Sequence, residues 1–395
     1  MSAILLLPVG IAAAVIAITA SLFCRKDPAY PSALVDELVL NRKGKHVPLN
    51  KLTIIVTGST NGLGKMIASK LYEMGATVII ASRSGEKSEK IVSEIKAKYP
   101  DSIGNLEVGI VDTSDMNSVV NFARLFLEGH AELHALINNA GIHYVSVKGD
   151  PLHNLSLPMV SPQGYDLAFA TNYLGHFLLT ELLLPIMSKT SDFGAVVNIA
   201  SSYHYLGSGD MLNPKINGSN SSTSPMAARS VINDYMHREL AYGNNKLAQV
   251  LHAKELQRRI IASGQHVRTV SICPGWVDTG MLPANLGGKF VGKLAFQVEE
   301  GILSTICGLF DSSLKGGEFV GNSYNIWARQ PFLFVAAEQL RLKGPICSFI
   351  AMYLLFFQKL SYGQCYVEIS SPDSMDENLS KALYDWSKSE IAQYL

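Results

Sequence analysis

The sequence predicts an α/β fold in which a doubly wound parallel sheet carries helices on both faces. Short apolar runs rich in β-branched residues alternate with helical stretches of ten or more residues, and a glycine-rich turn follows the first of these runs. Strands that alternate with such helices form βαβ units, and a strand buried on both faces is a continuous apolar run. A long uncharged segment near the N-terminus adds a transmembrane helix to the predicted architecture.

The alternation runs through most of the chain. The expected strands are, in order, LTIIVTG, ATVIIASR, LEVGIVD, LHALINNAG, GAVVNIASS and HVRTVSICPG. The helices expected between them are KMIASKLYEMG, GEKSEKIVSEIKAKYP, SVVNFARLFLEG, YLGHFLLTELLLPIM and NKLAQVLHAKELQRRI. Gly75 and Pro100 mark the ends of the first two helices, since neither residue favours a helix interior.

Composition excludes some classes of function. Lysine plus arginine equals aspartate plus glutamate at 33 each, so the chain has no net positive field with which to bind nucleic acid. The five cysteines are widely spaced and form neither a C-x-x-C motif nor a cysteine/histidine cluster. We therefore expect reduced structural thiols and no metal site.

The N-terminal segment predicts a membrane anchor. Residues 4–23 carry no charge, and a helix of 20 residues spans the ~30 Å core of a bilayer. A cleaved signal peptide is the alternative, but no basic residue precedes the apolar run, whereas Arg25 and Lys26 follow it directly. This flank favours a single-pass protein with a cytosolic domain, at the endoplasmic reticulum or on lipid droplets. Four N-x-S/T sequons, which would be used only in a lumenal domain, begin at Asn154, Asn217, Asn220 and Asn378.

We expect five parts along the chain. Residues 1–24 form the transmembrane anchor, residues 25–50 a linker, and residues 51–330 the nucleotide-binding domain. Residues 331–364 form a hydrophobic insertion, and residues 365–395 a helical extension of the domain. The insertion contains thirteen uncharged residues in succession, PICSFIAMYLLFF, a length that suits either an interfacial membrane helix or a buried core helix.

The glycine-rich turn TGSTNGLG predicts a nucleotide site. Glycines at these positions allow a tight turn and a close approach of the backbone to a pyrophosphate at the start of the next helix. The spacing is T-G-x-x-x-G-x-G rather than G-x-G-x-x-G, but the turn joins a predicted strand to a predicted helix, so the fold is expected to be Rossmann-type. The turn contributes Gly58, Thr60, Asn61, Gly62, Leu63 and Gly64 to the predicted cofactor site.

The end of the second strand indicates which cofactor is bound. Ser82 and Arg83 stand where an acidic residue would bind the ribose 2′-hydroxyl of NAD. An arginine pairs with a 2′-phosphate that a carboxylate would repel. The sequence therefore favours NADP(H) over NAD(H), with Lys87 as a second candidate cation; the alternative is that Arg83 is a solvated surface residue.

A tyrosine and a lysine in the segment YGNNK predict acid/base chemistry. Hydride transfer between a nicotinamide and a carbonyl or alcohol requires a general acid/base within hydrogen-bond reach of the oxygen. Tyr242 and Lys246 are four residues apart and would share one face of a helix. An ammonium beside a tyrosine favours the phenolate.

Two other tyrosine–lysine pairs have the same spacing. Tyr144 and Lys148 fall in an expected loop, and Tyr384 and Lys388 fall in an expected terminal helix. Only the pair in YGNNK lies between the serine-bearing strand and the next strand, so only this pair is expected at the carboxyl ends of the strands, where ligands bind in such folds.

Seven motifs give the chain its resemblance to a known family. Over residues 51–330, and weakly over 365–395, the chain resembles the short-chain dehydrogenases/reductases, with TGSTNGLG, VDTSD, NNAG, TNYLGHFLLT, VVNIASS, YGNNK and PGWVDTG in the family's order. The residues around Asn172 and Ser202 are most similar to the retinol-dehydrogenase-like branch, including its polyprenol-acting relatives. This resemblance implies an oxidoreductase. Together with Arg83 and the membrane anchor, it leads us to expect an NADP(H)-dependent enzyme acting on a lipophilic alcohol, aldehyde or ketone, such as a retinoid, polyprenoid, sterol or fatty compound.

The resemblance also implies roles for individual residues. Tyr242 would be the general acid/base, and Lys246 would assist it. Ser202 would bind the substrate oxygen, with Ser201 as the neighbouring candidate, and Asn172 would hold a proton-relay water near Lys246. The cofactor contacts implied are Asp112 at the adenine, Thr279 at the carboxamide, and Asn139, Gly141, Pro274 and Gly275 along the cofactor.

Two features depart from the family pattern. Asn245 stands where relatives often carry serine, and Ser202 precedes Tyr242 by 40 positions, a longer gap than in simpler members. Residues 207–234 fill this gap and are rich in Gly, Ser, Asn and Pro, so they predict a long loop, either a lid or a disordered insertion.

The expected partners are a small lipophilic substrate and the membrane; the sequence leaves open whether the chain forms a homodimer. The competing hypothesis is a catalytically silent, membrane-anchored binding or scaffold protein of the same fold. The presence of all four implied catalytic residues argues against this alternative.

Overall fold

The computed structural model describes residues 49–143, 160–190, 194–212, 235–279, 295–323, 362–368 and 370–395. The expected anchor, nearly all of the linker, the pair Tyr144 and Lys148, and most of the 207–234 loop and of the hydrophobic insertion lie outside the described residues.

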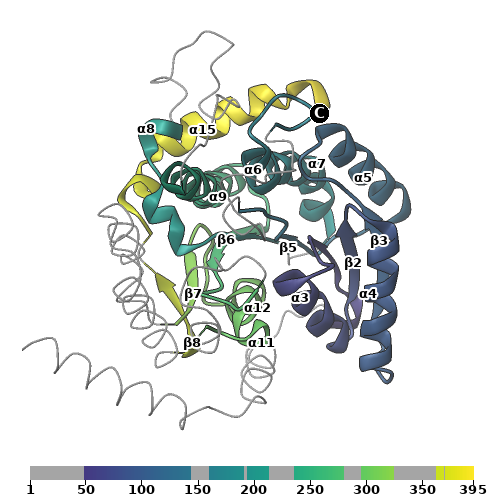
Figure 1. The fold of residues 1–395 in the computed structure, drawn as a ribbon. Helices are drawn as coiled ribbons and strands as arrows, with labels where there is room; N and C mark the ends of the chain where they lie inside the picture. The colour runs from purple at the N-terminus through teal and green to yellow at the C-terminus, as the bar shows by residue number, and fades with distance from the viewer. Residues whose placement is uncertain are drawn as a thin grey trace, which may run out of the picture.

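The described strands form one eight-stranded sheet in the order β3-β2-β1-β4-β5-β6-β7-β8. All neighbours pair in parallel except β7 and β8, which are antiparallel (Figure 1). The strands are β1 (Thr53–Thr57), β2 (Thr77–Ser82), β3 (Asn105–Ile110), β4 (Ala135–Asn138), β5 (Gly194–Ile199), β6 (Val267–Cys273), β7 (Phe319–Ser323) and β8 (Tyr362–Glu368). The predicted Rossmann-like α/β fold is confirmed, with an antiparallel edge strand added to the parallel sheet.

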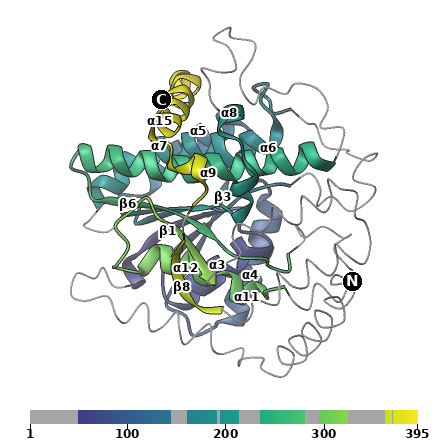
Figure 2. The same ribbon diagram turned by 90° about the vertical axis from the view of Figure 1, so that its left-hand side faces the viewer.

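Helices cover both faces of the sheet, as Figure 2 shows. The longer helices are α3 (Gly62–Glu73), α4 (Gly85–Lys98) and α12 (Leu303–Phe310) on one face, and α5 (Met116–Gly129), α7 (Gly175–Thr190), α9 (Tyr235–Ala262) and α15 (Glu377–Glu390) on the other. The shorter ones are η1 (Leu49–Lys51), α6 (Leu167–Phe169), η3 (Ala170–Leu174), η4 (Ser202–Leu206), α8 (Gly209–Leu212), α11 (Val298–Gly301), η5 (Pro372–Met375) and η6 (Ala392–Tyr394).

The alternation of side chains along each strand divides the core between the two faces. In β1, Ile54 and Val56 pack with α3, α4 and α12, whereas Ile55 packs with the helices of the opposite face. In the sheet Ile55 lies beside Ile79 of β2 and Leu136 of β4, and all three are buried. Burial on both faces explains why these strands are continuous apolar runs.

The C-terminal part of the chain completes the sheet edge and corrects two expectations. Residues 362–368, expected at the junction of the insertion and a helical extension, form strand β8. Cys307 of α12 and Cys365 of β8 form a disulfide, so the expectation of reduced thiols is wrong for this pair. The two cysteines are 58 residues apart in sequence, and only the return of β8 beside β7 brings them together. Cys273 is a free, buried thiol.

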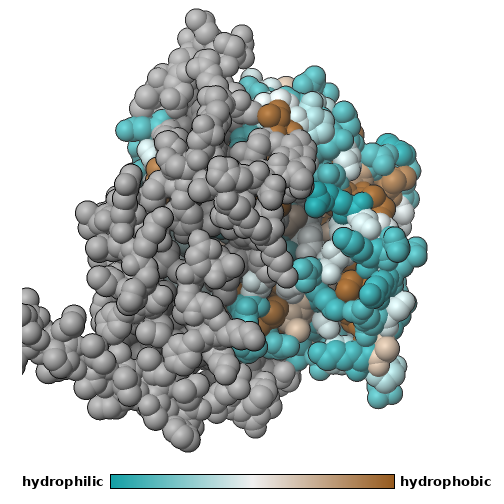
Figure 3. Space-filling view, in the orientation of Figure 1, coloured by the Kyte–Doolittle hydropathy of each residue, from teal (hydrophilic) through white to brown (hydrophobic). Residues whose placement is uncertain are grey.

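One described helical stretch, Leu167–Thr190, is long and apolar enough by composition to cross a bilayer. Because 78% of its most apolar window is buried inside the protein, it serves as a core helix. The face shown in Figure 3 is mainly hydrophilic over the described residues, with separate hydrophobic patches. Single exposed apolar side chains such as Leu125 and Ile110 are usual on protein surfaces.

Candidate active site

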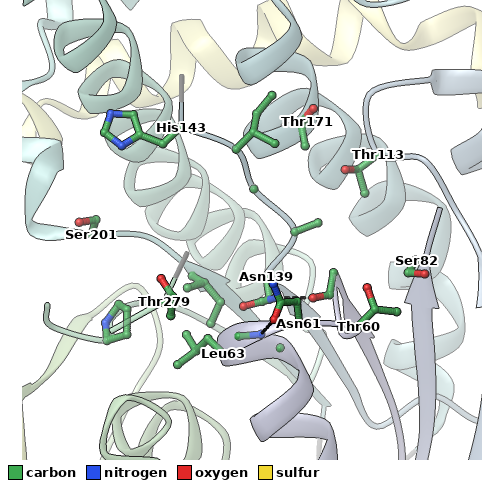
Figure 4. A pocket seen from close by; sticks show the side chains of 18 of the residues that line it. Thr60, Asn61, Leu63, Ser82, Thr113, Asn139, His143, Thr171, Ser201 and Thr279 are labelled. Carbon is green, nitrogen blue, oxygen red and sulfur yellow. Dashed lines mark hydrogen bonds between the residues drawn. The ribbon is translucent and has the colours of Figure 1, made fainter. Parts of the chain in front are cut away.

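A cleft of about 570 Å³ lies at the carboxyl ends of the parallel strands. It is lined by the segments that follow β1 to β6 and by one face of α9 (Figure 4). The strand order reverses between β1 and β4, so the loops after these strands diverge to opposite sides of the sheet and leave a crevice between them.

The glycine turn forms the floor of the cleft. At two of its glycines, a side chain would collide with neighbouring atoms. Gly58 has φ +66°, and a Cβ on it would lie 2.8 Å from Cα of Ala140. A Cβ on Gly64 would lie 2.4 Å from Nδ2 of Asn139 and 2.5 Å from the carbonyl oxygen of Gly58. Asn61 caps α3 by accepting a hydrogen bond from the amide of Gly62 at 2.8 Å. The start of α3 thus meets the cleft through bare backbone, an arrangement that fits a pyrophosphate.

Asn139, expected along the cofactor, also braces this turn. Its Nδ2 donates to the carbonyl oxygens of Thr57 at 2.8 Å and Gly58 at 3.3 Å. The hydroxyl of Thr57 accepts from the amides of Asn139 and Ala140, both at 2.9 Å. These bonds fix the loop after β4 against the turn after β1.

Cationic side chains stand at one end of the cleft. Arg83 and Lys87 are exposed and line it together with Ser82. The hydroxyl of Ser84 caps α4 by accepting from the amide of Lys87 at 3.3 Å. Two cations and the N-terminus of a helix of 14 residues favour an anionic group at this end.

Asp112, expected at the adenine, lines the same cleft. Its Oδ1 accepts from the amide of Ser114 at 2.9 Å and from the hydroxyl of Ser114 at 2.7 Å. The carboxylate is therefore held in a fixed position beside the end of β3.

Tyr242 and Lys246 lie at the other end of the cleft, where both belong to its wall. Nζ of Lys246 is 5.3 Å from the centroid of the Tyr242 ring, as expected for neighbours one turn apart. The ammonium donates to the carbonyl oxygen of Ile199 at 2.7 Å and to Oε1 of Gln249 at 2.9 Å. Burial lowers the pKa of Lys246 to about 7 because desolvation disfavours the ammonium.

The structure places Ser201, rather than Ser202, on the wall of the cleft. Ser201 is extended, at φ −168° and ψ 156°, and its hydroxyl accepts from the amide of Tyr203 at 3.2 Å. Helix η4 begins at Ser202 and turns that residue inward, where its amide donates to Sγ of Cys273 at 3.3 Å. Ser202 is 3% exposed and does not line the cleft, whereas its neighbour Ser201, the second candidate, does.

Asn172 lies behind the cleft, in the π-helical turn η3. Its side chain binds the backbone of Ile142, with Oδ1 accepting at 2.8 Å and Nδ2 donating at 3.0 Å. Its carbonyl oxygen accepts from Nε2 of Gln249 at 2.8 Å and pairs with Nδ1 of His176 at 3.2 Å. The side chain and the carbonyl oxygen of Asn172 thus bind protein groups behind the cleft.

Comparisons with known proteins agree with this architecture. The family model for short chain dehydrogenase matches residues 52–211. Human polyprenol dehydrogenase is 33% identical over 279 residues, which cover 68% of this chain and 75% of that protein. The chain is a short-chain dehydrogenase/reductase. Human retinol dehydrogenase 11 is 33% identical over 238 residues, covering 60% of this chain and 64% of that protein.

A solved structure extends the similarity. The crystal structure of an uncharacterized protein from Mycobacterium paratuberculosis matches with a TM-score of 0.55 and 26% identity, over 86% of this chain and 92% of that one. Within the short-chain dehydrogenases/reductases, the chain is thus similar to the retinol and polyprenol dehydrogenase branch, a group of oxidoreductases.

The remaining positions expected at the cofactor lie together in the structure. Gly141, Pro274, Gly275 and Thr279 all line the cleft. Gly275 has φ +76°, a conformation that side chains other than glycine rarely adopt. Figure 4 shows the side chains of several lining residues, among them Thr60, Leu63, Thr279, Ser201 and His143.

Sequence reasoning missed an aromatic wall beside Tyr242. The His143 ring stacks on Tyr242 with centroids 4.2 Å apart, and the Tyr203 ring meets Tyr242 edge to face at 5.6 Å. Trp276 and Ile142 line the same cleft. The only signal in the sequence was position, since these residues follow the NNAG, IASS and PG motifs within two residues.

The second tyrosine–lysine pair in the described residues has a structural role. Tyr384 and Lys388 of α15 both bind the carboxylate of Glu181 in α7. Burial and the neighbouring carboxylate raise the pKa of Tyr384, which opposes proton release. Neither residue lines the cleft.

Proposed function

We propose that this protein is an NADP(H)-dependent oxidoreductase acting on a lipophilic alcohol, aldehyde or ketone. The observation that carries the proposal is the convergence of Tyr242, Lys246 and Ser201 at one end of a cleft whose other end holds Arg83 and Lys87. When bound, the nicotinamide supplies or accepts the hydride. The glycine floor, which a Cβ would fill, supports the fit of the cofactor backbone.

The protein's own groups would handle the proton. In reduction, the hydroxyl of Tyr242 donates its proton to the substrate oxygen, and in oxidation the phenolate removes the proton. The hydroxyl of Ser201 donates a hydrogen bond to the same oxygen and polarises it. The ammonium of Lys246, one helical turn away, stabilises the phenolate. Reduction is the favoured direction where NADPH is the abundant form.

The preference for NADP(H) rests on the cationic end of the cleft. Arg83 can form paired hydrogen bonds to a 2′-phosphate, and Lys87 adds a second positive charge. The capped N-terminus of α4 reinforces both. The C-terminal end of strand β2 carries no carboxylate that would favour NAD(H).

The lipophilic substrate is inferred from three features together. The reacting end of the cleft has an aromatic and apolar wall formed by His143, Tyr203, Trp276 and Ile142. The uncharged segment 4–23 would hold the enzyme at a membrane, where lipophilic substrates partition. Similar proteins are named polyprenol dehydrogenase and retinol dehydrogenase. Retinoids and polyprenoids are therefore the first substrates to test.

Purified protein in detergent tests the function directly. We expect absorbance at the NADPH band to fall when retinaldehyde or a polyprenal is added, and to fall more slowly with NADH. If neither aldehyde consumes NADPH and Tyr242→Phe leaves cellular function unchanged, the protein is instead a silent binding or scaffold protein of this fold.

The serine assignment gives a paired prediction. Ser201→Ala should lower kcat by about 10²- to 10³-fold, since it removes a hydrogen bond that strengthens as charge develops on the substrate oxygen. Ser202→Ala should leave kcat within about twofold of wild type, because Ser202 faces Cys273. Steady-state kinetics on both variants check this, and a larger loss in Ser202→Ala would reverse the assignment.

We propose a single-pass membrane location with a cytosolic catalytic domain at the endoplasmic reticulum or lipid droplets. The basic flank at Arg25 and Lys26 supports this orientation. The Cys307–Cys365 disulfide favours the opposite one, since disulfides persist in oxidising compartments. Asn378 is exposed at the start of α15 and begins a sequon, so it reports on the choice. A cytosolic domain predicts no glycan there and digestion by protease added to sealed microsomes; a glycan would place the domain in the lumen.

A further inference from the structure

A glutamine side chain connects two groups at the back of the cleft. Gln249 is 2% exposed and lies three residues after Lys246 on α9. Its Oε1 accepts from Nζ of Lys246 at 2.9 Å, and its Nε2 donates to the carbonyl oxygen of Asn172 at 2.8 Å. The amide therefore spans the whole distance between the ammonium and this carbonyl.

Each of the two groups that Gln249 connects also has one further hydrogen-bond partner in the protein. Nζ of Lys246 also donates to the carbonyl oxygen of Ile199 at 2.7 Å, which leaves one N–H of the ammonium for the cleft. The carbonyl oxygen of Asn172 also pairs with Nδ1 of His176 at 3.2 Å. Both acceptors of the Lys246 ammonium are neutral oxygens, so its charge is held without an acidic partner.

The titratable groups around Lys246 come from three elements. Tyr242 lies on α9 itself, Cys273 on β6, and His176 on α7. Burial raises the pKa of the Cys273 thiol to about 11 and lowers that of His176 to about 4, so both are neutral near pH 7. Near pH 7, Cys273 and His176 therefore place no charge beside Lys246, whose other neighbours are Tyr242 and the neutral amide of Gln249.

We propose that Gln249 is a positioning residue: its amide is tied to the carbonyl oxygen of Asn172 on one side and holds the ammonium of Lys246 toward Tyr242 on the other. An amide can accept at its oxygen and donate at its nitrogen, so one side chain can fix both groups. This inference rests on the proposed function for its kinetic consequences but not for its geometry.

Two substitutions separate this role from simple packing. Gln249→Met fills a similar space without hydrogen bonds, whereas Gln249→Ala leaves room for a water, which takes up about 30 Å³ and needs two to four polar partners. Nζ of Lys246 and the carbonyl oxygen of Asn172 would supply them. We expect kcat to fall by about 10- to 100-fold in Gln249→Met, the scale of a lost hydrogen bond to a charged group, and by less in Gln249→Ala. Thermal stability should show the opposite order, because the smaller side chain packs less.

A second measurement does not need turnover. Trace acetic anhydride labels a lysine only as the free amine, so the pH dependence of Lys246 labelling, followed by mass spectrometry in the unliganded protein, reports its protonation. The wild-type midpoint is expected near pH 7, since burial lowers the pKa of Lys246 to about 7. Loss of the acceptor oxygen in Gln249→Met should move the midpoint about one unit lower, and a water in Gln249→Ala should restore it.

Gln257 provides the matched control. It is another buried glutamine of α9, and its Oε1 accepts from the amide of Thr269 at 2.7 Å, away from the cleft. Gln257→Met should lose stability while its kcat and its Lys246 midpoint match wild type. An unchanged midpoint in Gln249→Met, or Gln249→Ala slower than Gln249→Met, would overturn the proposal. Absence of turnover in the wild type would refute the proposed function alone, because the labelling experiment would still test Gln249.

Discussion

Tyr242→Phe is expected to lower kcat by about 10²- to 10⁴-fold, the usual contribution of a positioned general acid/base. Phenylalanine retains the ring that packs against His143 and Tyr203 and removes only the hydroxyl. The affinity for NADPH and the thermal stability should therefore remain close to wild type. Kinetics with the best substrate, together with a fluorescence titration of NADPH, measure the two quantities separately.

The second tyrosine of the same spacing is the control for this loss. Tyr384→Phe removes a hydroxyl that binds Glu181 in the packing of α15 on α7. We expect it to cost about 1.5–3 kcal/mol of unfolding free energy, the scale of a hydrogen bond to a charged group, and to leave kcat unchanged. If Tyr242→Phe kept wild-type turnover, or if Tyr384→Phe lost as much, the acid/base assignment would be wrong.

Arg83→Asp is expected to weaken NADPH binding by about 100-fold or more while NADH binding changes little. The substitution removes a charged hydrogen-bonding partner of the 2′-phosphate and places a repelling carboxylate there, each a substantial effect. The same carboxylate can accept from the ribose hydroxyl of NADH. Dissociation constants of both cofactors, measured at one fixed salt concentration, provide the test.

A change of net charge alone could also weaken binding, so a charge-matched control is needed. Arg124 is exposed on α5, pairs with Glu128 and does not line the cleft. Arg124→Asp should leave the ratio of NADPH to NADH affinity unaltered. An equal loss for both cofactors in Arg83→Asp would remove Arg83 from the 2′-phosphate site.

Several parts of the structure could be predicted because they depend on local sequence. Strands buried on both faces must be apolar throughout, and a turn that meets a helix start through bare backbone must contain glycine, as Gly58 and Gly64 show. Residues four apart on a helix must share a face, so the neighbourhood of Tyr242 and Lys246 followed from their spacing.

The aromatic wall and the disulfide were decided by contacts between distant segments. His143 follows β4, Tyr203 lies in η4 and Tyr242 lies in α9. These separate segments meet only because they pack around the same sheet. Cys307 and Cys365 meet because an antiparallel edge strand returns over α12. No periodicity in one segment reports on the side chains of another.

The parallel α/β architecture could be predicted from the alternation of strands and helices, and the glycine turn and the tyrosine–lysine pair from backbone geometry within one element. Which serine faces the cleft, and what lies behind Lys246, depend on packing between separate elements. Ser201 and Ser202 are adjacent, and only the turn from β5 into η4 directs one outward and the other toward Cys273. Likewise, Gln249 is an ordinary helical residue in the sequence, and it bridges Lys246 to Asn172 only because α9 packs against η3.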